Sequence, residues 1–194
     1  MLHNRFHGMT IVRGTLDDVP AVLHLLDSRV KWLVSRGNVQ QWGAAPLSES
    51  PKRIEQVKEI MTTDLGTWLA IKVADDKSTT DGEAPGVIVG AIGLGDCKKY
   101  PYVTPVSEPE IYVRLLVTDP EWAGIGIGEY LLEHTRNLAN KEGVSLIRLD
   151  CYGGGEGKLI QYYESQGFER FESSVVEGWP SQVLALRLSG VKGE

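Results

Sequence analysis

Two hydrophobic periods alternate along the chain. Apolar residues recur every three or four positions from Val19 to Val34, which predicts an amphipathic helix capped by Asp17 and ended by Gly37. The same period predicts helices over 50–61, from 127 to 139 and over 156–166. Runs rich in Val, Ile and Leu predict strands over 9–13, 67–74, 86–94, 110–118, 145–151, 168–176 and 182–188, with the last two joined around Trp179 and Pro180.

This order of elements is typical of an α/β or α+β protein, in which a central mixed sheet of about seven strands is flanked by about four helices. The length of 194 residues fits one domain, which we assign to residues 9–190 after a disordered stretch over 1–8. Polar residues over 75–85 predict a mobile loop between two strands. Apolar and charged fractions of 42% and 24% are those of an ordinary globular protein.

Composition and charge narrow the function classes. No run approaches the ~20 apolar residues of a membrane span, and the first residues lack the apolar core of a secretory signal, so we expect a cytoplasmic protein with no membrane contact. A net charge of −6 argues against nucleic acid as a partner. Cys97 and Cys151 are far apart and show no metal-ligand spacing, so no metal is predicted.

The segment from Leu115 to Leu132 carries the most distinctive chemistry. It joins a strand, an Asp119-Pro120 turn, glycines at 124, 126 and 128, and the start of a helix. Glycine permits positive φ and close approach to the backbone, so successive N–H groups can converge on one point. The positive end of the helix dipole adds to this point, which predicts an anion site.

Other glycine-rich turns match this segment less well. A P-loop carries Lys and then Ser or Thr after its last glycine, whereas Glu129 and Tyr130 follow here. A dinucleotide fingerprint has the spacing G-x-G-x-x-G in the first βα unit, whereas this spacing is G-x-G-x-G and lies two-thirds along the chain. A turn without a ligand is the remaining alternative.

The segment resembles the pyrophosphate loop of the GCN5-related N-acetyltransferases (GNAT), which reads Gln/Arg-x-x-Gly-x-Gly/Ala after a Leu-x-Val-x-Pro-like strand. The matching stretches are 116–120 and 123–128, with Thr118 in place of the usual Val and Ala123 in place of the usual Gln or Arg. The resemblance implies a GNAT-like domain with a mostly antiparallel sheet and acetyl-CoA as cosubstrate. The implied cofactor-binding residues are Leu116, Val117, Thr118, Ala123, Gly124, Ile125, Gly126, Ile127, Gly128 and Glu129.

A second segment, 157–168, resembles the closing motif of the same family, in which a helix carries a tyrosine four residues before Gly-Phe. Tyr163 stands at that position before Gly167 and Phe168. The resemblance implies that its phenol protonates the departing thiolate, as a general acid. The alternative is a tyrosine packed in the core, and the adjacent Tyr162 is the weaker candidate.

Transfer to an amine also requires a neutral nucleophile. An amine with a pKa near 10.4 is neutral in about one molecule in 2,500 at pH 7, which corresponds to about 4.6 kcal/mol. We predict that Glu110 is the base, directly or through water, with Glu108 and Asp96 as alternatives. A solvated strand-end carboxylate without a catalytic role is equally compatible with the sequence.

The expected function is therefore acetyl transfer from acetyl-CoA to a primary amine by direct attack. The alternatives are a non-catalytic acetyl-CoA or CoA-binding module and a nucleotide-binding oxidoreductase. The acceptor is expected to be a small molecule, with a homodimer as one allowed assembly. Trp32, Trp42 and Tyr112 are the predicted acceptor-binding residues. An aromatic-lined pocket would suit an apolar amine, whereas the acidic charge balance would suit a polyamine or aminoglycoside.

Overall fold

A computed structural model of the chain describes residue 6 and residues 8–73 and 86–189. The predicted disorder over 1–8, apart from residues 6 and 8, and the predicted loop over 75–85 lie outside this part of the chain. The strands are β1 (Met9–Arg13), β2 (Thr67–Lys72), β3 (Val87–Gly95), β4 (Glu110–Thr118), β5 (Leu146–Tyr152), β6 (Glu169–Val176) and β7 (Trp179–Arg187). The α-helices are α1 (Val19–Ser35), α2 (Pro51–Met61), α3 (Ile127–Lys141) and α4 (Lys158–Ser165).

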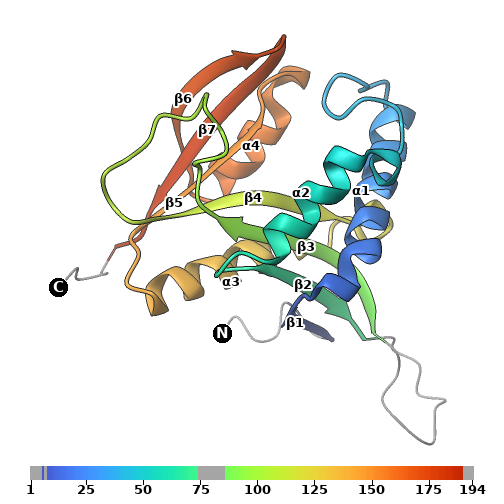
Figure 1. Cartoon of the computed structure of the whole chain (residues 1–194), viewed down its shortest axis with the longest axis horizontal. Helices are drawn as coiled ribbons and strands as arrows, with labels where there is room; N and C mark the ends of the chain where they lie inside the picture. The colour runs from blue at the N-terminus through green and yellow to red at the C-terminus, as the bar shows by residue number, and fades with distance from the viewer. Residues whose placement is uncertain (1–5, 7, 74–85, 190–194) are drawn as a thin grey trace, which may run out of the picture.

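The seven strands form one sheet in the order β1-β2-β3-β4-β5-β7-β6. All neighbours pair antiparallel except β4 and β5, which are parallel. The helices α1 and α2 cover one face of the sheet, and α3 and α4 cover the other (Figure 1). This arrangement confirms the predicted fold class.

Each face of the sheet has its own apolar core. On the first face, Val22 and Leu26 of α1 pack with Val57 of α2 against Leu69 and Val117. On the second face, apolar residues of α3 and α4 cover the other side of the same strands. Burying apolar side chains on both faces is the main stabilising contribution in such a layered domain.

The turn between the last two strands differs from the prediction. Trp179 and Pro180 lie inside β7, where Pro180 is paired with Val175, and the turn consists of Glu177 and Gly178. Both turn residues have positive φ, 50° and 83°. Such left-handed residues match the twist of a tight hairpin, so the strands can pair up to the residues beside the turn.

The parallel pairing of β4 with β5 stops well before either strand ends. It runs from Glu110 opposite Leu146 to Val113 opposite Leu149, after which β4 continues to Thr118 and β5 to Tyr152. A bulge lies at this point, because Leu94 pairs with Val113 and Gly93 with Leu115, leaving Arg114 without a partner residue. The sheet therefore opens into a wedge between residues 114–118 of β4 and 150–152 of β5.

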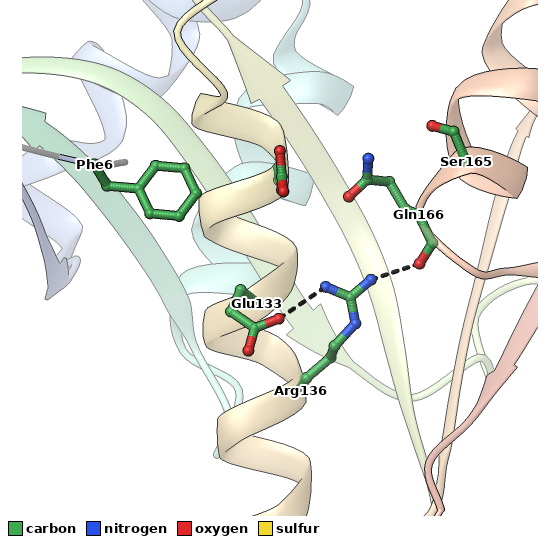
Figure 2. A pocket seen from close by; sticks show the side chains of 6 residues that line it. Phe6, Glu133, Arg136, Ser165 and Gln166 are labelled. Carbon is green, nitrogen blue, oxygen red and sulfur yellow. Dashed lines mark hydrogen bonds and ion pairs between the residues drawn. The ribbon is translucent and has the colours of Figure 1, made fainter. Parts of the chain in front are cut away.

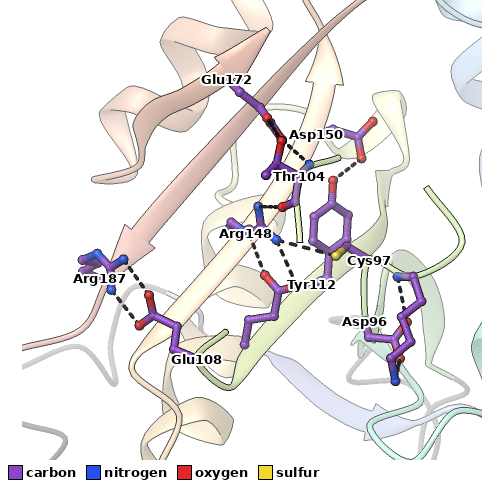
Figure 3. A network of polar contacts seen from close by, with 11 residues as sticks. Asp96, Cys97, Thr104, Glu108, Tyr112, Arg148, Asp150, Glu172 and Arg187 are labelled. Carbon is purple, nitrogen blue, oxygen red and sulfur yellow. Dashed lines mark hydrogen bonds and ion pairs between the residues drawn. The ribbon is translucent and has the colours of Figure 1, made fainter. Parts of the chain in front are cut away.

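A buried ion pair fastens the segment 96–109 to the closed end of this wedge (Figure 3). The fully buried Arg148 on β5 donates to both carboxylate oxygens of Glu110, at 2.6 Å and 3.1 Å. Its third bond, 2.9 Å long, goes to the carbonyl oxygen of Thr104. Thr104 in turn donates from N–H and hydroxyl to Glu172 of β6. The segment is thus held as an ordered rim over the sheet.

We expect Arg148→Ala to lower the free energy of unfolding by about 3–5 kcal/mol, because Glu110 would be left as a buried charge without its partner. Chemical denaturation monitored by circular dichroism measures the change. Arg187→Ala is the matched control, since Arg187 also pairs with one glutamate, Glu108, but at the exposed surface. Equal losses in the two variants would contradict a structural role for the buried pair.

Candidate functional site

The glycine segment forms a loop between the end of β4 and the start of α3. Asp119 accepts a hydrogen bond from the Glu121 N–H (3.0 Å), which starts a short 3-10 turn over Pro120–Trp122. Gly124 and Gly126 then adopt φ values of +87° and +84°. These conformations are left-handed, so both positions favour glycine.

Free backbone donors collect at this loop. Within the described residues, the backbone N–H groups of residues 125 to 128 donate no hydrogen bond. Three of these groups belong to the N-terminal cap and first turn of α3, where the helix dipole is positive. The loop can therefore bind an anion through its backbone, and the side chain at Ala123 is not required for this.

The end of β4 presents alternate backbone groups to the wedge. The Asp119 N–H donates to the Val89 carbonyl oxygen of β3 (2.9 Å). Because backbone groups alternate in direction along a strand, those of Leu116 and Thr118 point away from β3, toward β5. Val117, in contrast, directs its backbone toward β3 and its side chain into the core beneath α1. Of the predicted strand residues, Leu116 and Thr118 thus face the wedge and Val117 does not.

The predicted loop residues also differ in their surroundings. Ile125 is 40% exposed, whereas Ile127 is buried in the core between α3 and the sheet. Glu129 lies on the first turn of α3, beside a pocket that also contains Phe6, Glu133, Arg136, Ser165 and Gln166 (Figure 2). In this pocket Arg136 bridges Glu133 (3.1 Å) and the Gln166 carbonyl oxygen (2.6 Å), and so ties α3 to the end of α4.

Tyr163 lies on α4 beside the open part of β5. It belongs to the core cluster that includes Cys151, and its ring packs edge-on against Tyr162 and Phe168 at centroid distances of 5.2 Å and 5.9 Å. Burial, with the nearby Cys151 thiol as the next contribution, raises the pKa of Tyr163 well above its ordinary value. The phenol is therefore protonated throughout the ordinary pH range, as a proton donor must be.

Tyr162 projects toward the glycine loop. Its hydroxyl occupies the space where a Cβ at position 128 would lie, so Gly128 allows this close approach. The two adjacent tyrosines of α4 therefore point to different parts of the wedge: Tyr163 toward Cys151, Tyr162 toward the start of α3. Tyr162 is the weaker candidate from the sequence, and its proximity to the loop comes from the packing of α4 against α3.

A carboxylate that the sequence analysis did not select lies where the wedge opens (Figure 3). Asp150 is the first β5 residue beyond the parallel pairing, and it accepts hydrogen bonds from the hydroxyls of Tyr112 (2.7 Å) and Tyr102 (3.2 Å). Burial raises the pKa of Asp150, and the two tyrosine hydrogen bonds partly offset this effect. Within the described residues it has no cationic partner.

The loop after α1 reaches across to the end of β5. Gln40 accepts a hydrogen bond from the Tyr152 hydroxyl (2.9 Å), and the Gln41 carbonyl oxygen accepts one from the Trp179 indole (2.9 Å). These bonds connect segments more than a hundred residues apart, and no local sequence pattern could have indicated them. The loop therefore borders the wedge on the face that carries Asp150.

The predicted base Glu110 takes part in the buried ion pair with Arg148. Glu110 lies in the closed part of the sheet, where both its oxygens accept hydrogen bonds from Arg148. To act as a base, Glu110 would have to leave its ion pair. It also lies opposite Leu146, four residues along β5 before Asp150, where the wedge opens. The alternatives are also paired at the surface, Glu108 with Arg187 and Asp96 with Lys98.

The three predicted acceptor residues lie in different surroundings. Tyr112 is fully buried and donates a hydrogen bond from its hydroxyl to Asp150. Trp32 on α1 is 38% exposed and has the guanidinium groups of Arg29 and Arg36 over its ring, 5.1 Å and 5.4 Å from the centroid. Trp42 packs against the core beneath α1 and α2.

The described residues contain neither a membrane-spanning helix nor a metal-binding cluster. No helix there is long and apolar enough to cross a membrane. Likewise, no group of three or more His, Cys, Asp or Glu side chains in that part of the chain is arranged to hold a metal ion.

Solved structures share this fold at low sequence identity. The ribosomal-protein-S18-alanine N-acetyltransferase from Escherichia coli is 19% identical, with a TM-score of 0.61 over 96% of this chain and 97% of that one. A Salmonella typhimurium protein assigned as an acetyltransferase, with its cofactor acetyl-CoA, is 16% identical, with a TM-score of 0.61 over 95% and 96% of the two chains. The NatC complex bound to Gag peptide and CoA contains a chain that is 16% identical, with a TM-score of 0.55 over 93% and 99%.

The part of the sequence that matches a known protein family contains both strands of the wedge. No curated protein sequence matches the chain. The sequence model of the acetyltransferase (GNAT) domain, however, matches residues 69–170, more than half of the chain, from β2 through the start of β6. The chain therefore belongs to the GNAT acetyltransferase family.

Proposed function

We propose that this protein transfers the acetyl group of acetyl-CoA to a primary amine by direct attack. The observation that carries the proposal is the combination of three features at one opening of the sheet. These are the free backbone donors at the glycine loop, the inward-facing backbone of Leu116 on β4, and the carboxylate of Asp150 at the inner end. The family supports acetyl transfer in general, and the amine specificity is the proposed part.

The residues present fit acetyl-CoA. The N–H groups of residues 125 to 128 would hold its diphosphate. The inward backbone groups of Leu116 and the N–H of Thr118 would pair with its pantetheine arm, whereas the Thr118 carbonyl oxygen already accepts a hydrogen bond from Arg29. Tyr162, whose hydroxyl touches the position of Gly128, would border the same path. When bound, acetyl-CoA supplies a thioester carbonyl that a neutral amine can attack, with a thiolate as leaving group.

Asp150 is proposed to hold the acceptor amine and to take its proton. A buried carboxylate without a cationic partner is costly, and an ammonium group would neutralise it. The hydroxyls of Tyr112 and Tyr102 fix both of its oxygens, which aligns the carboxylate for this role. The raised pKa of Asp150 also brings its basicity closer to that of the amine than an ordinary carboxylate would.

Tyr163 is proposed to give its proton to the thiolate. Tyr163 lies on α4 beside Cys151, which follows Asp150 on β5 and faces the opposite side of the sheet. Asp150 would thus contact the acceptor amine, and Tyr163 the leaving thiolate, from opposite faces of the sheet. Cys151 is not proposed as a nucleophile, because burial raises the pKa of its thiol to about 12.

The first test of the proposal is a direct assay. Free thiol should appear when the protein is incubated with acetyl-CoA and a panel of primary amines, with a product heavier by one acetyl group in mass spectrometry. CoA should raise the thermal midpoint of the protein, and NAD should not. A CoA-induced shift with no thiol release from any amine would instead identify a non-catalytic CoA-binding module.

Gly126→Val is expected to abolish CoA binding, because the branched side chain would fill the space in front of the α3 donors. The control is Gly143→Val at the other end of α3, where φ is also left-handed (+69°) and nothing lies within 4 Å of an added Cβ. Both variants should lose similar stability from backbone strain. Isothermal calorimetry should show CoA binding in the control alone, and wild-type affinity in a folded Gly126→Val protein would refute the placement.

Tyr163→Phe removes only the hydroxyl and should preserve the packing against Phe168. If the phenol protonates the thiolate, kcat should fall by roughly 10²–10⁴ while CoA affinity changes little. Tyr162→Phe is the matched control on the same helix and should retain kcat within a small factor. Full turnover by the Tyr163 variant, with chemistry rate-limiting, would make Tyr163 a packing residue.

Asp150→Asn is expected to lower kcat/KM for amines by roughly 10²–10⁴ and to alter the pH dependence of stability. The pKa of Asp150 is raised in the folded protein, so its contribution to stability is present at low pH and is lost as pH rises. The free energy of unfolding of the wild type should therefore fall relative to that of the Asn variant from about pH 4 upward. Parallel stability curves over that range would contradict a raised pKa.

A further inference from the structure

Arg29 of α1 lies at the point where β4 passes into the glycine loop. Its Nη2 donates hydrogen bonds to the Thr118 carbonyl oxygen at 2.6 Å and to the Thr118 hydroxyl at 2.7 Å. Because the backbone of Thr118 points away from β3, its carbonyl group faces the wedge. The Arg29 guanidinium therefore lies at the outer end of the wedge, beside the first residues of the loop.

Contacts through one side chain connect this guanidinium with the backbone donors of α3. The Thr118 hydroxyl accepts the bond from Arg29, while the Thr118 methyl carbon lies 4.0 Å from the position that a Cβ at Gly128 would take. Gly128 is the last of the residues 125 to 128, whose N–H groups donate no hydrogen bond within the described part of the chain. Arg29 and these donors are thus separated by a single threonine side chain, which the two phosphate groups of a diphosphate can bridge.

The loop itself carries acidic side chains and no basic ones. The segment 119–129 contains Asp119, Glu121 and Glu129 but neither Lys nor Arg. A diphosphate bound to the backbone donors would therefore lie among carboxylates, and the dipole of α3 supplies only about half a positive charge. Arg29, which contacts the strand end next to this segment, adds a full positive charge from a different element of the fold.

The charge of Arg29 has no close counter-charge. Within the described residues no carboxylate lies at ion-pair distance, and both of its hydrogen bonds start from Nη2, so Nε and Nη1 have no acceptor there. Burial lowers the pKa of Arg29, and the charge of Asp119 only partly offsets this effect. A half-buried guanidinium with two unused donor groups has the properties of a phosphate-binding residue.

The Trp32 ring holds the Arg29 side chain from its other side. The guanidinium carbon of Arg29 lies 5.1 Å from the ring centroid, and that of Arg36 lies 5.4 Å from it. Stacking on the indole restricts the Arg29 side chain and so reduces the entropy lost when a ligand binds. The guanidinium is therefore held in position before any ligand arrives.

Both departures from the family's loop pattern fall at this place. Ala123 stands where the pattern has Gln or Arg, so the loop lacks a long polar side chain of its own. Thr118 stands where the pattern has Val, and a valine would offer no hydroxyl to Arg29. One contact accounts for both departures, since the Thr118 hydroxyl holds beside the loop a cationic side chain that comes from α1.

We propose that Arg29 binds the diphosphate of CoA through Nε and Nη1, with the Thr118 hydroxyl as its positioning group. This inference rests on the proposed function, because it uses the placement of CoA at the glycine loop. The 3′-phosphate of CoA is a second anion with the same chemistry. Dephospho-CoA, which keeps the diphosphate and lacks the 3′-phosphate, distinguishes the two sources.

Equilibrium binding tests the proposal without turnover. CoA and dephospho-CoA are titrated by calorimetry into the wild type, Arg29→Gln and Arg36→Gln. Arg29→Gln should bind both ligands at least roughly ten-fold more weakly than the wild type, because charge-assisted bonds to the diphosphate are lost. Arg36→Gln is the matched control, since it removes the same charge from the other arginine over Trp32. Its affinities should equal those of the wild type.

Two substitutions at position 118 test the positioning role and do not depend on the folding of Arg29→Gln. Thr118→Val keeps the shape of the side chain and the charge of Arg29 but removes the hydroxyl, so it should lose part of the affinity for both ligands. Thr118→Ser, which keeps the hydroxyl, should recover most of that loss. Equal affinities in the Val and Ser variants would contradict the role of the hydroxyl.

Three results would overturn the assignment of Arg29. These are wild-type CoA affinity in Arg29→Gln, an equal loss in Arg36→Gln, and a loss for CoA that is absent for dephospho-CoA, which would assign Arg29 to the 3′-phosphate. Failure of the proposed function appears separately. A wild type that binds CoA but releases no thiol with any amine would contradict acetyl transfer, whereas the affinities of the Arg29 and Thr118 variants would still decide this assignment.

Discussion

The parallel pairing of β4 with β5 ends at Val113 and Leu149 while both strands continue, and the candidate site depends on this interruption. Beyond it, each strand remains paired on its outer side, β4 with β3 and β5 with β7. Half of the backbone groups of each strand are therefore satisfied, and the other half face the opening. Backbone groups without partners are costly in a protein interior, so a ligand with amide groups of its own is a natural occupant.

The bulge at Arg114 explains how the sheet accommodates the opening. One extra residue in β4 reverses which side chains face which helices, so Ile111 and Val113 pack toward α3 while Leu115 and Val117 pack toward α1. The opening is thus braced by a core on each face. Arg148 and Glu110 brace its closed end by joining β4, β5 and the segment 96–109.

The buried and half-buried charges of this fold divide into two kinds. Arg148 and Glu110 neutralise each other and accept or donate further hydrogen bonds, which suits a structural role. Asp150 and Arg29 lie beside the opening, held by neutral hydroxyl and carbonyl groups but without an opposite charge among the described residues. These two charged groups are held in position but are not neutralised, so an oppositely charged group of a ligand can interact favourably with them.

The sequence by itself determined the helices and strands and the left-handed glycine loop. Helix and strand periods are local, and the glycines at 124 and 126 indicate left-handed backbone without any tertiary contact, as their positive φ values confirm. Only the tertiary structure decided which charges are paired. Glu110 and Asp150 lie on the two strands of the parallel pair, yet Glu110 faces Arg148 and Asp150 faces two tyrosines. The register of β4 against β5 and the path of the segment 96–109 set these distances. Pairing of charges depends on contacts between residues far apart in the chain, and no local period encodes them.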